Sequence, residues 1–179
     1  ATSEQVIFDC YQCGMEILNR RSDTMVVAKP KRAGAILRTP ELSELRAPYL
    51  ESGRFKILDP MSIDATNAIA ISDATLSSVM SAPYLEALCC RRAGFSYVPF
   101  AKGSSPMSQA GFGKVIFNDR EALLDAIDDA LDNPVDDPAA CLNGVIDRVD
   151  PFRDHRAIDR MRDFICRLPS AAAIEPGTA

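Results

Sequence analysis

The sequence predicts an α/β protein with a Rossmann-like, doubly wound parallel sheet of about five strands. Short β-prone runs alternate with longer segments whose apolar residues recur at helical spacing, which is the order expected of parallel strands with crossover helices. The 179 residues are 47% hydrophobic and 25% charged, proportions and a length typical of one globular domain. We therefore assign residues 1–167 to one domain and residues 168–179 to a disordered tail.

The first half of the chain predicts two helices and two strands. Apolar residues at helical spacing indicate a helix from Ser3 to Arg21, and the next strand, at 25–28, runs into the basic loop Lys-Pro-Lys-Arg. A second helix begins near Pro40 and ends before Gly53, positions that proline and glycine favour at the two ends of a helix. The second strand is expected at 55–58.

The middle of the chain is less regular. A single helical turn is expected at 62–68, and the fully apolar run at 68–72 predicts a third strand that helices cover on both faces. Residues 75–80 stay ambiguous. The strongest helix signal follows from Ser81 to Gly94, with a serine cap candidate, a proline in the first turn and basic residues in the last turn.

The second half predicts two more strands and two more helices. The strands are expected at 95–99 and 114–118, separated by a glycine-rich loop. Asp119 is the expected cap of a helix that continues to about Asn133, and the last helix is expected from about Asp154 to Arg167.

The net charge and the spacing of the cysteines argue against two kinds of function, nucleic-acid binding and metal binding. The net charge of −5 argues against nucleic-acid binding. Cys10 and Cys13 have the C-x-x-C spacing of zinc and redox sites, but the adjacent Cys89 and Cys90 are poorly spaced to complete one metal site. We therefore expect structural thiols, no bound metal or cofactor, and a reducing, cytoplasmic compartment.

Candidate binding residues follow the predicted strands, where ligands of open parallel sheets bind. Lys29 and Lys31 follow the first strand, and a serine-rich approach containing Ser78 leads to the helix start at Ser81 and Ala82. A helix N-terminus offers unpaired N–H groups that suit a phosphate. Glu86 lies one turn into that helix, where its carboxylate could accept hydrogen bonds from a ribose.

A plainer interpretation remains open for each of these residues. Ser81 and Glu86 are also what an ordinary capped helix would carry near its N-terminus, and the lysines also fit a solvated turn. Nucleophilic catalysis is not predicted, since no G-x-S-x-G elbow is present and the single histidine, His155, lies near the last helix. No Walker loop or G-x-G-x-x-G fingerprint occurs either.

The block ISDATLSSVMSAPYLEALCCRRAGFSYVPF, residues 71–100, resembles the donor-binding half of GT-B glycosyltransferases, above all those of bacterial surface-carbohydrate and capsule biosynthesis. That group has a strand ending in Ser-Asp, a small-residue turn, a helix containing Glu-Ala-Leu and a strand ending near proline. The flanking segments MVVAKPKR, GKVIFNDREALLDAID and VDPFRDHRAIDRMRDFI are similar to the group's other segments.

The resemblance implies a nucleotide-sugar donor and a carbohydrate acceptor. Ser81 and Ala82 would hold the diphosphate, Glu86 the ribose, and Lys29 and Lys31 would face the phosphates. Such enzymes generally need no metal, because helix dipole and basic side chains stabilise the leaving charge. The implied place is the cytoplasm, at the inner face of the bacterial membrane through a partner.

Under this resemblance, the chain would have about half the size of a two-domain GT-B enzyme and would start at the first helix of the donor half, without the strand that comes before it. The resemblance therefore implies a separate N-terminal acceptor domain or a homodimer, and the catalytic base stays unassigned. Two other kinds of protein remain open as interpretations of the sequence. One is a polyol-phosphate transferase or sugar-nucleotide epimerase on the same scaffold, and the other is a non-catalytic Rossmann-like interaction module.

Overall fold

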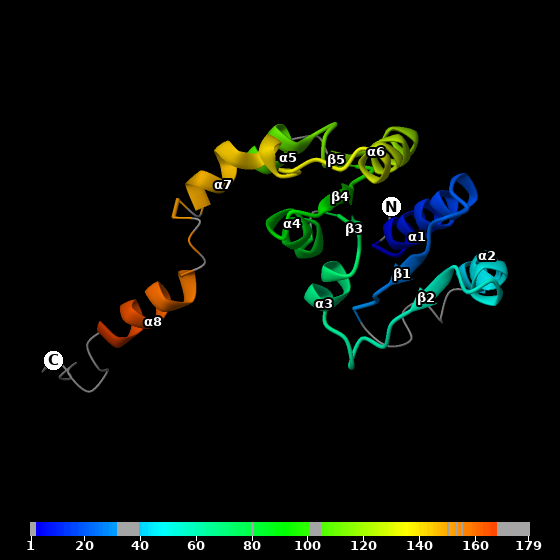
Figure 1. Ribbon diagram of the computed structural model, residues 1–179, viewed down its shortest axis with the longest axis horizontal. Helices are drawn as coiled ribbons and strands as arrows, with labels where there is room; N and C mark the ends of the chain where they lie inside the picture. Colours follow the sequence, from blue (N-terminus) through cyan, green and yellow to red (C-terminus); the bar gives the residue numbers. More distant parts are fainter. Residues whose placement is uncertain are drawn as a thin grey trace, which may run out of the picture. The chain divides into compact units, whose positions relative to one another are not determined.

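The computed structural model describes residues 3–31, 40–79, 81–100, 105–149, 151–152, 154 and 156–167 (Figure 1). The chain divides into two compact units, Ala1–Leu142 and Asn143–Ala179. The first unit carries all the strands of the described residues, and helices separate consecutive strands along the chain.

The elements of the first unit alternate as the sequence predicts for an α/β protein. In chain order they are α1 (Ser3–Arg20), β1 (Val26–Ala28), α2 (Pro40–Glu51), β2 (Phe55–Ile57), α3 (Ala65–Ala70), β3 (Ala74–Ser78), α4 (Ala82–Cys89), β4 (Ala93–Tyr97), α5 (Pro106–Gly111), β5 (Ile116–Phe117), α6 (Arg120–Asp132) and the 3₁₀ turn η1 (Ala140–Leu142). The α/β class is confirmed.

The strands form two small parallel sheets among the described residues. One sheet has the order β1-β2, with Val26 opposite Phe55. The other has the order β3-β4-β5, with Leu76 opposite Phe95 and Tyr97 opposite Phe117. Strand β4 is the only one of these with a neighbour on both sides, so its residues 94–97 are buried.

Helix α1 packs against both sheets. On one side Cys13 and Ile17 join a core with Phe95 of β4 and Leu124 of α6. On the other side Met15 and Leu18 join Ala28 and Phe55 of the smaller sheet. The apolar residues of α1 therefore serve two cores, which explains why they cover more than one stripe of the helix.

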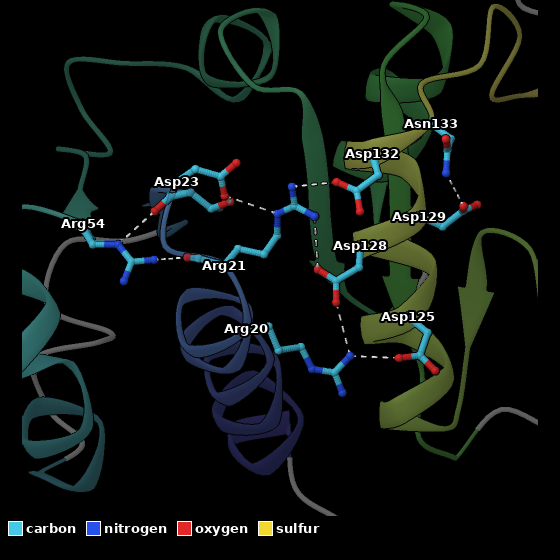
Figure 2. A network of polar contacts seen from close by, with 10 residues as sticks. Arg20, Arg21, Asp23, Arg54, Asp125, Asp128, Asp129, Asp132 and Asn133 are labelled. Carbon is cyan, nitrogen blue, oxygen red and sulfur yellow. Dashed lines mark hydrogen bonds and ion pairs between the residues drawn. The ribbon is translucent and has the colours of Figure 1, made fainter.

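Charged residues fasten the end of α1 to α6 (Figure 2). Arg20 bonds Asp125 at 2.9 Å, and Arg21 bonds Asp132 at 2.8 Å. Arg54, just before β2, donates to the carbonyl of Leu18 at 2.8 Å. The acidic face of α6 thus has basic partners on α1 and is not only a solvated surface.

Two predictions about the elements are wrong. Residues 65–70 form helix α3 and not part of a strand at 68–72, because the Asp64 side chain accepts the Asn67 N–H and caps an alanine-rich turn. The third strand is β3 (Ala74–Ser78), most of which lies in the stretch at 75–80 that was left ambiguous. Part of the predicted loop at 101–113 is helix α5, which begins at a capping Ser105.

The predicted end of this helix at Gly94 is also wrong, since α4 ends at Cys89. Gly94 lies inside β4, and the residue that takes a left-handed conformation after the helix is Arg91, at φ 56°. The absence of a side chain at Gly94 has another use. A Cβ there would come within 2.3 Å of the Tyr84 carbonyl oxygen. Only a glycine at this position therefore allows β4 and α4 to lie this close together.

The second unit consists of α7 (Asn143–Val149) and α8 (Ala157–Arg167) within the described residues. The sequence did not predict α7. Helix α8 matches the predicted last helix, with the Asp154 carboxylate accepting the Arg156 N–H ahead of its first turn. The predicted tail at 168–179 and His155 lie outside the described residues. No described helix combines the length and apolar character that crossing a bilayer requires.

Candidate functional site

One large cleft opens in the first unit, with a volume of about 1540 Å³. All residues of β1 and β3 line it, together with one side of α1, the start of α4 and parts of α3 and α6. Because β1, β3 and the N-terminus of α4 border the same space, this cleft is the candidate ligand site.

The six predicted site residues, Lys29, Lys31, Ser78, Ser81, Ala82 and Glu86, all line this cleft. Ser78, Ser81 and Ala82 lie at the β3–α4 turn, where the Ser81 hydroxyl donates to the Ser78 carbonyl at 3.1 Å, and Glu86 lies further along α4. Lys29 and Lys31 come from the loop after β1, with Lys29 half-buried and Lys31 exposed.

Backbone strain marks the β3–α4 turn. Val79, directly after β3, takes a φ of 52°, a left-handed conformation that a β-branched residue rarely adopts. Three hydrogen bonds hold it there: its N–H donates to Tyr97 O at 3.0 Å, and its carbonyl accepts from Ser81 N–H at 2.7 Å and from Ser96 Oγ at 2.5 Å. Such strain persists only where the surroundings enforce it, and it clusters at functional sites.

The N-terminus of α4 is left without a side-chain cap. Ser81 has the extended backbone of an N-cap residue, at φ −95° and ψ 161°, yet its hydroxyl makes no capping bond. That hydroxyl points back to Ser78 O instead. The first amides of α4 therefore keep their partial positive charge for a ligand, apart from Pro83, which has no N–H.

Glu86 contributes an unpartnered acceptor to the same cleft. Its Oε2 atom is buried and makes no hydrogen bond with the described residues, while the residue as a whole is half-buried. A buried carboxylate oxygen without a donor is costly. A ligand hydroxyl pair would supply the donors that this oxygen lacks.

Lys29 has a neighbouring carboxylate. The pKa of Asp59 lies below its ordinary value, first because Ser62 Oγ donates to it, then because of the Met61 N–H and the charge of Lys29. The charge of Lys29 therefore acts on Asp59, with a smaller effect than the hydrogen bonds from Ser62 and Met61.

The paired thiols of α1 are not reactive groups. Burial raises the pKa of Cys10 to about 12 and that of Cys13 to about 11. A thiol that stays protonated is a poor nucleophile, because the thiolate is the reactive form. In the part of the chain that the structure describes, no cluster of three or more His, Cys, Asp or Glu side chains could hold a metal ion.

Sequence reasoning found the group at α4 but missed Val79. The left-handed backbone of Val79 has no signal in the sequence, since valine is among the residues least suited to it. Arg32, the last residue of the predicted basic loop, lies outside the described residues.

No protein-family model, no curated protein and no solved structure matches the chain.

Proposed function

We propose that this chain is the donor-binding domain of a GT-B-like glycosyltransferase that uses a nucleotide sugar in surface polysaccharide biosynthesis. The observation that supports it is the uncapped start of α4 beside Glu86, whose buried Oε2 has no partner among the described residues. The start of α4 suits a diphosphate, the Glu86 carboxylate suits a pair of hydroxyls, and both line the same cleft.

The proposed binding mode assigns one part of the donor to each group. The diphosphate lies at the first amides of α4, where small side chains at Ser81 and Ala82 let it approach the backbone. The ribose hydroxyls donate to the Glu86 carboxylate. Lys29 and Lys31 add positive charge from the loop after β1, which offsets the charge that develops on the leaving diphosphate.

In this proposal the two parallel sheets belong to one Rossmann-like, doubly wound sheet. The acceptor hydroxyl attacks the anomeric carbon of the sugar, and the nucleoside diphosphate leaves. The acceptor and the catalytic base come from a separate acceptor domain or from a second copy of the chain. The reaction takes place in the cytoplasm, where a partner holds the protein at the inner face of the membrane.

Isothermal titration with UDP, GDP, CDP and CMP tests the proposal. We expect one of the diphosphates to bind more tightly than CMP, because two phosphates reach both α4 and the lysines. Glu86→Gln should weaken that binding about 10-fold or more, since a hydrogen bond to a charged group is worth roughly 1.5–3 kcal/mol. Lys29→Ala should weaken it less.

The matched controls are Glu51→Gln and Lys56→Ala. Both residues are exposed and neither lines the cleft, so both variants should bind like the wild type. Absence of binding by every nucleotide at millimolar concentration would contradict the proposal. Equal weakening by Glu86→Gln and Glu51→Gln would contradict the role given to Glu86.

A further inference from the structure

The two sheets of the first unit each present an open edge to the same cleft. Strand β1 pairs only with β2, and β3 pairs only with β4, among the described residues. All residues of β1 and β3 line the cleft, whereas β2 contributes only Phe55 and β5 contributes none. The edges of β1 and β3 therefore face one space, and the outer edges of the two sheets do not.

The hydrogen bonds show which backbone groups are directed into that space. The Val26 N–H donates to Arg54 O and the Ala28 carbonyl accepts from Leu58 N–H, both across to the β2 side. Successive residues of a strand alternate in direction, so the N–H and C=O of Val27 are directed away from β2. In β3 the same alternation follows from the Val79 N–H, which donates to Tyr97 O on the β4 side. The N–H and C=O of Leu76, three residues earlier, are therefore directed away from β4.

The side chains along these edges are also incompletely covered. Val26, Val27 and Leu76 are only half-buried, whereas the residues of β4 from Gly94 to Tyr97 are buried. Strands of a parallel sheet are normally buried on both faces. The two edges thus combine unpaired backbone groups with apolar side chains that remain partly in water.

Helix α1 limits the distance that separates the two edges. It contacts both β1 and β3, and a helix with its side chains is about 10–12 Å across. One additional strand between two others needs two spacings of about 4.8 Å, which is nearly the same length. A space that one helix spans therefore has room for one strand.

We propose that the cleft between β1 and β3 takes one further β-strand, which joins the two sheets into one and leads into α1 as the first member of a β-α-β unit. The inference comes from the two open edges and from α1, and it does not depend on the proposed function. The strand is about five residues long, to match β3. It is rich in Val and Ile, because Gly14, Ile17, Ala68 and Ile69 line the space around it.

A strand in this position would change the cleft without removing the candidate ligand site. It would fill the apolar middle between Val27 and Leu76. The β3–α4 turn and the loop after β1 lie beyond the ends of their strands, so they would remain open as a smaller pocket.

The experiment joins a Val-Val-Ile-Val-Val strand to the start of the chain through a short Gly-Asn-Asp loop, and compares it with the unmodified 179-residue chain. We expect hydrogen exchange at the Val27 and Leu76 amides to slow about 10-fold or more, since both gain a partner. The Ser96 amide, which already donates to Val115 O at 2.8 Å, is the internal reference. The thermal midpoint should also rise.

A matched extension with proline at its second and fourth positions is the control, because proline cannot donate to a sheet and disrupts strand pairing. It should leave exchange at Val27 and Leu76 unchanged. Equal protection by both extensions, or protection by neither, would overturn the proposal. A dimer of the unmodified chain with both amides already protected would assign the open edges to a second copy and would overturn it as well.

Discussion

The two sheets of the first unit differ in how far each builds its own core. Strands β3 and β4 pair over five residues, β5 closes the far side, and a cluster around Phe95 and Leu124 fills the space under α1 and α6. Strands β1 and β2 pair over three residues and have no central strand. Two-stranded sheets are marginal by themselves, so the smaller sheet depends on α1 and on Arg54 for its place.

The first unit thus has two halves: the β3–β4–β5 half has its own core, and the β1–β2 half depends on α1 for its place. The β3–β4–β5 half holds the strained Val79 turn, and strain of that kind needs a rigid surrounding. The β1–β2 half carries the loop with Lys29 and Lys31, and the position of these lysines does not require a rigid surrounding. The proposed site thus combines one rigid and one adaptable side.

A matched pair of substitutions tests this contrast most strongly. Phe95→Ala should lower the free energy of unfolding by about 3–5 kcal/mol, the usual cost of deleting a buried phenyl ring. Phe55→Ala removes the same ring from an equally buried position, but the smaller sheet can collapse around the gap. We therefore expect a cost near the lower end of that range or below it, measured by urea denaturation.

Equal losses for Phe95→Ala and Phe55→Ala would remove the distinction between the two halves. The slope of the urea curve supplies a second readout. A lower slope for Phe55→Ala alone would show that β1 and β2 have separated from the rest before global unfolding.

The second contrast uses two glycines. Gly94→Ala places a Cβ 2.3 Å from the Tyr84 carbonyl oxygen, and backbone must shift to accept it, so we expect a loss of about 1–3 kcal/mol or more. Gly14→Ala places its Cβ 3.5 Å from Val26 Cγ1, an ordinary contact, and removes a glycine from a helix interior. That variant should gain roughly 0.5–1 kcal/mol.

Thermal denaturation of both glycine variants measures the difference. A stabilised Gly94→Ala protein would show that β4 and α4 can separate without cost. A destabilised Gly14→Ala protein would show that α1 lies closer to β1 than an alanine allows.

The sequence predicted the elements that local patterns specify. Helix α4 was found from its serine, proline and basic residues, and α6 from its Asp119 cap, which does accept the Ala122 N–H. The error at 68–72 arose because a short apolar run suits a helix and a strand equally. The Asp64 cap decided between them, and it lies outside the apolar run.

The candidate site, like the fold, could be predicted from the sequence only where local patterns specify it. Helix starts and strand ends can be recognised locally, so the places of Ser81 at the start of α4 and of the two lysines after β1 were predicted. The buried, unpartnered oxygen of Glu86 and the left-handed Val79 result from packing between β3, β4 and α4. No local pattern contains that packing, and the division into two sheets likewise depends on long-range pairing.

The smallest expected effect concerns the ion pairs by which α1 holds the two halves together (Figure 2). The pKa of Asp132 lies below its ordinary value of about 3.8, chiefly because Arg21 donates a hydrogen bond to it. A carboxyl whose pKa is lower in the folded chain adds stability above the ordinary value and loses it as pH falls through the lowered value. Asp132→Asn should therefore shift the urea midpoint down at pH 7 and leave it almost unchanged near pH 2. Asp136→Asn, at an exposed position outside this network, should follow the wild type at both. If Asp132→Asn cost the same at both pH values, its effect would come from packing, and α1 would be held to α6 by its apolar residues alone.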